Sequence, residues 1–122
     1  MIIVDTSVWV EHLKSGDPTL AMLLDDGQVL GHPFVLGELA LGGLRGRHAV
    51  LEALRGLPQA IVANDDEVLT MIERRALWGR GIGFVDAHLL AATALSQARL
   101  WTRDRGLAAV AAELDLARPG DG

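Results

Sequence analysis

The most constraining feature of the sequence is a set of short apolar runs that alternate with longer segments of helical pattern. The runs are rich in Val, Leu and Ile, and they predict strands at residues 1–4, 28–31, 60–63 and 99–102. Continuous apolar runs of this length are typical of strands buried on both faces of a parallel sheet. The segments between and after them predict helices at residues 7–14, 19–27, 34–44, 47–57, 65–78, 84–98 and 106–114. This alternation predicts an α/β fold with a mostly parallel sheet.

The boundaries of the first helix and of the domain also follow from the sequence. Thr6 or Ser7 is predicted to cap the first helix, because a hydroxyl there can accept a hydrogen bond from a free backbone N–H. Residues 115–117 are a further candidate edge strand. A length of 122 residues favours a single domain. We expect residues 1–117 to form that domain and residues 118–122 to be a frayed tail.

Composition excludes several classes of protein. The chain has no cysteine, so it has no disulfide framework, and any metal must be held by oxygen or imidazole. Its longest uncharged stretches, residues 27–37 and 87–98, are shorter than the roughly 18 to 20 residues that cross a bilayer. The amino terminus has no basic stretch of the kind that begins a secretory signal. We therefore expect a cytoplasmic protein with no membrane contact.

Charge and hydrophobicity bear on the partners of the chain. A formal net charge of −5 argues against an extended basic surface that binds nucleic acid by neutralising its phosphates. Nearly all of the basic residues are arginine, however, and Arg103 and Arg105 form one of several arginine clusters. Such clusters suit bidentate contacts with phosphate, although a solvated surface explains them equally well. Half of the residues are hydrophobic, which indicates that a partner covers some apolar surface.

Two acidic residues come soon after predicted strands. Asp5 follows the strand at residues 1–4, and Asp104 follows the strand at residues 99–102. In doubly wound sheets, functional residues lie beyond the carboxyl ends of the strands, near the point where strand order reverses. Neighbouring strands are about 4.8 Å apart. If these two strands are neighbours, both carboxylates can reach one crevice.

Two further acids, Glu38 and Asp86, lie in unusually apolar surroundings early in predicted helices. Each acid taken singly has an ordinary explanation: a cap for Asp86, a turn or cap for Asp104, a turn for Asp5, and a solvated helix position for Glu38. All four together are harder to explain, because carboxylates about 4 Å apart repel by roughly 4 kcal/mol per pair at an effective dielectric of about 20. A proton or a cation would offset that repulsion. Carboxylate oxygens favour Mg²⁺ or Mn²⁺.

The four acids are carried by the motifs "IIVDTSVWVE", "GELALGGL", "FVDAHLLAAT" and "LWTRDRGL". In order and spacing these motifs resemble those of PIN-domain ribonucleases, and most closely those of the VapC toxins of bacterial toxin–antitoxin pairs. The similarity runs over nearly the whole chain. It implies that residues 1–117 form one PIN-like nuclease domain, a three-layer α/β/α sandwich with a short, mostly parallel sheet.

The resemblance also implies roles for individual residues. The family's catalytic, metal-binding acids, which hold Mg²⁺ or Mn²⁺, are matched by Asp5, Glu38, Asp86 and Asp104. Thr102 matches a hydroxyl often found beside the last acid, and Ser7 is a candidate partner of the acids, with helix capping as its alternative role. Arg103 and Arg105 lie near the predicted crevice and are candidate contacts for RNA.

The activity implied by the resemblance is hydrolysis of an RNA phosphodiester by a water activated on a divalent ion, leaving a 5′-phosphate and a 3′-hydroxyl. A VapB-type antitoxin that occupies the site and a homodimer are also implied. One alternative is a catalytically silent RNA- or protein-binding module on the same fold. Another is a receiver-like phosphoacceptor, which resembles proteins with a late lysine, whereas the only lysine here is Lys14. A third, a haloacid-dehalogenase-type phosphatase, has a second aspartate where this chain has Ser7.

Overall fold

The sheet at the centre of the molecule is short, parallel and three-stranded. The computed structural model describes residues 1–119, and its strands are β1 (Ile2–Val4), β2 (Val29–Leu30) and β3 (Arg99–Trp101). Their spatial order is β2-β1-β3, so β1 is the central strand. Ile3 pairs with Leu30 on one side and with Leu100 on the other. The predicted α/β class with a parallel sheet is confirmed, and so is the adjacency of the first and last predicted strands.

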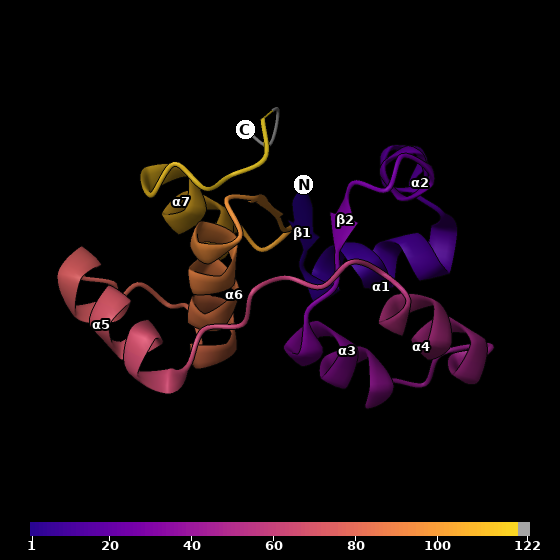
Figure 1. Cartoon of the computed structure of the whole chain (residues 1–122), viewed down its shortest axis with the longest axis horizontal. Coiled ribbons are helices and arrows are strands. Elements are labelled where there is room, and N and C mark those ends of the chain that lie inside the picture. Colours follow the sequence, from indigo (N-terminus) through magenta and orange to yellow (C-terminus); the bar gives the residue numbers. More distant parts are fainter. Residues whose placement is uncertain (120–122) are drawn as a thin grey trace.

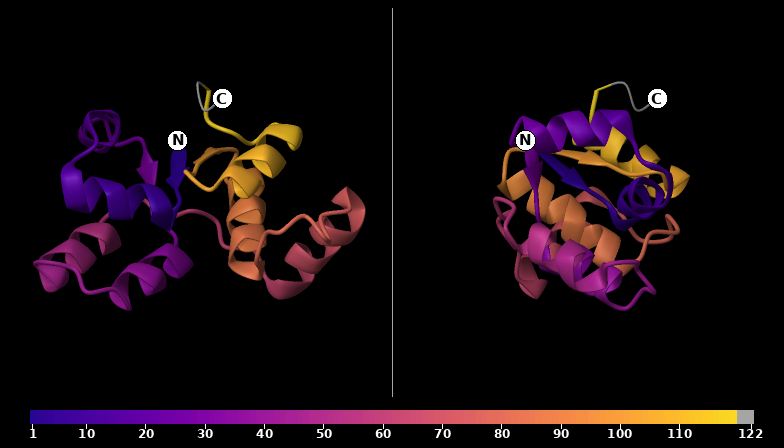
Figure 2. Two further views of the ribbon diagram at one scale, coloured as in Figure 1. Left: turned by 180° about the vertical axis from the view of Figure 1, so that it is seen from behind. Right: turned by 90° about the vertical axis from the view of Figure 1, so that its right-hand side faces the viewer.

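Helices cover both faces of the sheet. Within residues 1–119 they are α1 (Thr6–Ser15), α2 (Pro18–Asp25), α3 (Pro33–Ala40), α4 (Arg47–Arg55), α5 (Asp65–Arg75), α6 (Phe84–Leu95) and α7 (Arg105–Glu113). Figure 1 shows α1 to α4 on one side of the strands and α5 to α7 on the other, and the view from behind in Figure 2 agrees. The molecule is therefore the three-layer α/β/α sandwich that the family resemblance implied.

Helix α6 is the most deeply buried helix, because it packs between the sheet and α5. Every residue from Ala87 to Thr93 is buried. Ala87 packs in a small cluster with Val68 of α5, and Leu90 belongs to the main core that includes the strands. A helix that is apolar on all sides is typical of such a position. This packing fixes the amino-terminal turn of α6, which carries Asp86, relative to the sheet.

The strand predicted at residues 60–63 is wrong. Only Gly31 and Gln59 form a parallel bridge beside β2, after which the chain leaves the sheet. Ile61 and Val62 are exposed, and the Ile61 N–H donates to Ser96 Oγ at 2.9 Å, beyond the end of α6. The segment is a connection between the two helical layers, in which Ile61 and Val62 face solvent while Ala60 and Ala63 are buried.

The predicted cap of the first helix is also wrong. Helix α1 begins at Thr6 with Asp5 in the capping position, and the Asp5 side chain makes no capping hydrogen bond. The Ser7 hydroxyl donates to the Asp5 carboxylate instead of capping the helix. The first turn of α1 is therefore organised around Asp5.

The candidate edge strand at residues 115–117 is reduced to one parallel bridge between Leu100 and Ala117. Arg118, at the start of the predicted tail, donates its backbone N–H to Leu100 O at 3.0 Å and lies over the ring of Trp101. The end of that tail, residues 120–122, lies outside the described residues. Among residues 1–119, no helix combines the length and the apolarity needed to span a membrane.

A matched pair of substitutions tests this account of the sheet. Leu100→Ala should lower the free energy of unfolding by about 2 to 5 kcal/mol, because Leu100 is fully buried and its loss leaves a cavity. Ile61→Ala should change it by less than about 0.5 kcal/mol, because this side chain is 56% exposed. Urea unfolding measures both. Comparable losses would mean that residues 60–63 pack as a buried strand after all.

Candidate functional site

The site is built on the neighbouring carboxyl ends of β1 and β3. The Asp5 backbone N–H donates to Trp101 O at 2.9 Å, which extends the pairing of the strands by one step. The Asp5 side chain is buried, and its Oδ2 accepts hydrogen bonds from Ser7 Oγ at 2.7 Å and Thr102 Oγ1 at 2.8 Å. Two hydroxyls, one from α1 and one from the end of β3, therefore hold this carboxylate in place.

The same hydroxyls organise the turn from β3 into α7. Ser7 Oγ accepts the Arg103 backbone N–H at 3.0 Å, and Thr102 Oγ1 accepts the Asp104 backbone N–H at 3.0 Å. Asp104 Oδ1 accepts from Leu107 N at 3.0 Å and so caps α7. The capping role considered for Asp104 is thus present, and it also orients the side chain at this corner of the sheet.

Asp86 stands in the first turn of α6 and is also held by backbone. Its Oδ2 accepts the Gly83 N–H at 3.1 Å. Burial raises the pKa of the Asp86 carboxyl above its usual value, and the negative charges of Asp5, Asp104 and Glu38 raise it further, against the opposing effect of the Gly83 hydrogen bond. The structure therefore brings the other three predicted acids close enough for their charges to act on Asp86.

Glu38 is exposed on the surface of α3, and Asp104 is likewise exposed at the start of α7. Glu38 Oε1 accepts a hydrogen bond from Thr6 Oγ1 at 2.7 Å. Thr6 was predicted only as a possible helix cap, not as part of the site. No local pattern signals this contact, because the two residues are 32 positions apart and belong to different helices. The Gly83 contact, by contrast, has the three-residue spacing of a helix cap.

The four carboxylates share one pattern of hydrogen bonding. Each has one oxygen that accepts from the protein, while its other oxygen has no hydrogen-bond donor or ion-pair partner among residues 1–119. In the same part of the chain, no three His, Asp or Glu side chains lie close enough to hold one metal ion. The acids therefore lie around one corner of the sheet without forming a closed set of metal ligands among the described residues.

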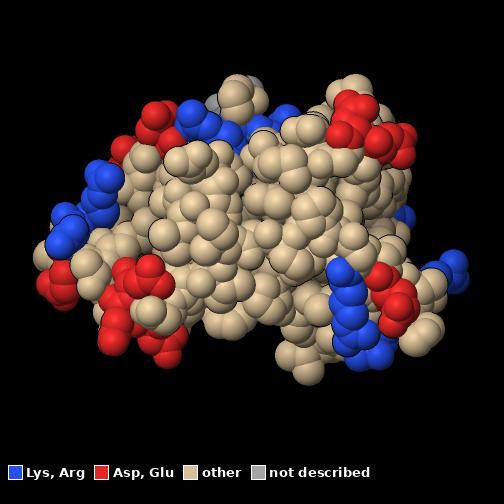
Figure 3. Space-filling model, viewed as in Figure 1, with Lys and Arg blue, Asp and Glu red and all other residues tan. Residues whose placement is uncertain are grey.

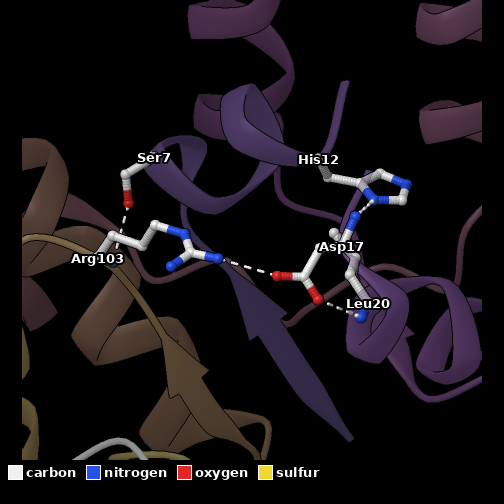
Figure 4. A network of polar contacts seen from close by, with 5 residues as sticks. All are labelled: Ser7, His12, Asp17, Leu20 and Arg103. Carbon is white, nitrogen blue, oxygen red and sulfur yellow. Dashed lines mark hydrogen bonds and ion pairs between the residues drawn. The ribbon is translucent and has the colours of Figure 1, made fainter. Parts of the chain in front are cut away.

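Arg103 extends from this corner toward the start of α2. Figure 4 shows its guanidinium turned to Asp17, where Nη2 lies 2.9 Å from Asp17 Oδ2. Asp17 also accepts from Leu20 N and donates its own N–H to His12 Nδ1. Arg105, the other predicted RNA contact, is the first residue of α7 and is exposed, with no ion pair within residues 1–119.

Two buried histidines form a separate polar cluster. His88 Nε2 lies 3.1 Å from Asp65 Oδ1, and the Phe34 ring packs against both His32 and His88. Burial, together with the neighbouring His88, lowers the pKa of His32 to about 4. His32 is therefore neutral near pH 7 and packs as part of the core.

Comparison with known proteins shows the family to which the chain belongs. The chain matches the model of the PIN domain over residues 2–113. Two proteins named "Ribonuclease VapC32", from Mycobacterium tuberculosis strains CDC 1551 / Oshkosh and ATCC 25618 / H37Rv, are each 52% identical to it over 118 residues. Each alignment covers 96% of this chain and 95% of the relative. The resemblance seen in the four acidic motifs is confirmed, and the chain belongs to the PIN-domain family, with VapC proteins as its relatives.

Proposed function

We propose that this protein is a metal-dependent endoribonuclease and the toxin of a VapBC-type toxin–antitoxin pair. The observation that carries the proposal is the group of four acids, Asp5 and Asp104 after β1 and β3, Glu38 on α3 and Asp86 on α6. The charges of the other three contribute to the raised pKa of Asp86. No Lys or Arg within residues 1–119 forms an ion pair with any of them. Membership of the PIN-domain family and the relatives named as ribonucleases support the same activity.

The chemistry of the site fits a divalent cation. Asp5, Glu38, Asp86 and Asp104 present hard carboxylate oxygens, the ligands preferred by Mg²⁺ and Mn²⁺. When bound, such an ion would activate a water for attack on a phosphodiester and offset charge on the phosphate. Ser7 and Thr102 would keep the Asp5 carboxylate oriented for this role through their hydroxyl donors. Asp86 would hold a proton more readily than an ordinary aspartate while no cation is present.

The second candidate function is a catalytically silent RNA- or protein-binding module on the same fold. The observation that favours it is the spacing of the acids, which within residues 1–119 do not meet in a group that could hold one ion. A receiver-like phosphoacceptor is not proposed for a member of the PIN-domain family. The two remaining functions differ in whether the acids are needed for cleavage of RNA.

Substitution of two acids separates these functions. Asp5→Asn and Asp86→Asn should abolish Mg²⁺-dependent cleavage of a labelled RNA. The metal-free Tm should stay unchanged or rise, because each change removes a repelling charge. Mg²⁺ should raise the Tm of the parent protein more than that of either variant, because ligands stabilise the state that binds them. Variants that cleave RNA at the parent rate would contradict the proposed mechanism. Loss of stability of about 0.5 to 2 kcal/mol with intact cleavage would assign the acids to capping.

The pH dependence of metal-free stability gives an independent check on Asp86. Its folded-state pKa is raised, so its contribution to stability is complete below the ordinary value of 3.8 and is lost as pH rises through the raised pKa. The lowered pKa of His32 acts in the opposite direction, since stability falls as pH drops from 6.5 toward about 4. His32 is present in both the parent and Asp86→Asn, so its contribution cancels in the difference between their free energies of unfolding. That difference should grow in favour of the variant as pH rises, and a flat difference would contradict the assigned shift.

Arg103 and Arg105 are proposed contacts for the RNA backbone. Replacing both with glutamine should weaken RNA binding and flatten its dependence on salt, because fewer phosphate charges are neutralised. Arg55→Gln is a matched control, since Arg55 is exposed on α4 and pairs only weakly with Glu52 at 3.6 Å. Filter binding at several salt concentrations measures the slope. An unchanged slope in the double variant would show that these two arginines are solvated.

Two protein partners are proposed, a VapB-type antitoxin and a second copy of the chain. Large apolar side chains remain exposed, among them Met22, Leu41, Ile61 and Trp78. Figure 3 shows a broad face whose centre lacks charged side chains. The purified chain should sediment as a dimer, or aggregate until an antitoxin peptide is added. A stable monomer at low concentration would contradict the dimer. The RNA substrate implies a cytoplasmic location, which cell fractionation would test.

A further inference from the structure

The four acids of the site are held in place by different kinds of donor. Asp86 and Asp104 accept backbone N–H groups three residues away, at the amino-terminal ends of α6 and α7. Asp5 accepts the hydroxyls of Ser7 and Thr102, close to it on the chain and on the paired strand. These three acids stand where strands end or helices begin.

Glu38 has no such local donor. It is the sixth residue of α3, beyond the first turn, where the backbone N–H groups are already used within the helix. It is also exposed and has a long side chain with many rotamers. A donor from another element is therefore needed to hold its carboxylate toward the other acids.

Thr6 supplies that donor. It is the first residue of α1, so no preceding helical turn offers its hydroxyl a backbone carbonyl. The hydroxyl donates to Glu38 Oε1 at 2.7 Å, a length typical of a strong hydrogen bond to a charged oxygen. Because Thr6 directly follows Asp5, this bond fixes the position of Glu38 relative to the buried Asp5. The other oxygen, Oε2, remains available.

We infer that Thr6 is a positioning residue, whose hydroxyl holds Glu38 so that its second carboxylate oxygen can serve as a ligand for the divalent cation. The inference rests on the proposed function, because it assigns Thr6 a part in the metal site of that function. Thr6 itself contacts neither the cation nor RNA in this role. Removal of a hydrogen bond to a ligating carboxylate typically costs about 10 to 100-fold in metal affinity.

The test is Mn²⁺ binding by the full chain without RNA, followed by electron paramagnetic resonance. Thr6→Val keeps the branched shape and removes the donor, and it should weaken Mn²⁺ binding by about tenfold or more. Thr6→Ser keeps the donor and should bind close to the parent. In a Glu38→Gln background, Thr6→Val should cause little further loss, because residues that act as a unit are not additive. Metal-free melting curves check folding, and Thr6→Ala serves as a second variant without the donor.

The outcomes separate this inference from the proposed function. Equal Mn²⁺ affinity in the parent and Thr6→Val would overturn the role of Thr6 while leaving the metal site intact. If Thr6→Val lowers Mn²⁺ affinity as much in the Glu38→Gln background as in the parent, the role of Thr6 would also be overturned, since Thr6 would then act independently of Glu38. A parent chain that binds no Mn²⁺ would overturn both the metal site and the role of Thr6.

Discussion

The parallel pairing of β1 with β3 is the constraint on which the site depends. Its register places Val4 opposite Trp101, so the next residues, Asp5 and Thr102, leave the sheet side by side. The hydrogen bond from Asp5 N to Trp101 O carries the pairing to the last position before the chains diverge. A slip of one residue would turn Asp5 to the other face of the sheet and separate it from the Thr102 hydroxyl. Burial of residues such as Ile3 and Leu100 in the core opposes any such slip.

Gathering four carboxylates at this corner is unfavourable, and the surrounding structure shows how it is tolerated. Each carboxylate accepts at least one hydrogen bond from a hydroxyl or a backbone N–H, and such bonds stabilise the charged form. Asp86 nevertheless has a raised pKa, because burial and three neighbouring charges outweigh its single bond to Gly83. This remaining repulsion is the physical basis of the proposal that a cation binds there.

Different helices hold the acidic side chains at this corner in place. Helix α6 is buried along most of its length, so Asp86 at its beginning sits on a rigid element. Helix α3 is short, and Glu38 on its outer surface depends on a contact from α1. The ion pair between Arg103 and Asp17 joins the β3–α7 turn to the start of α2. The position of this corner therefore depends on contacts between separate elements as well as on the three short strands.

The sequence by itself determined the fold class and three of the four predicted strands, because buried parallel strands leave continuous apolar runs. It also placed Asp5 and Asp104 soon after two of those strands. Predictions from local sequence pattern were wrong where contacts between distant parts of the chain determine the structure. Residues 60–63 are as apolar as a strand, but the chain leaves the edge of β2 after Gln59 and runs on as a connection whose larger side chains, Ile61 and Val62, are exposed. Ser7 is suited to capping, yet its hydroxyl donates to Asp5, whose buried charge is the stronger acceptor. The pairing of Thr6 with Glu38 joins two helices that are distant in sequence, so only their packing in the folded chain could bring that donor to that carboxylate.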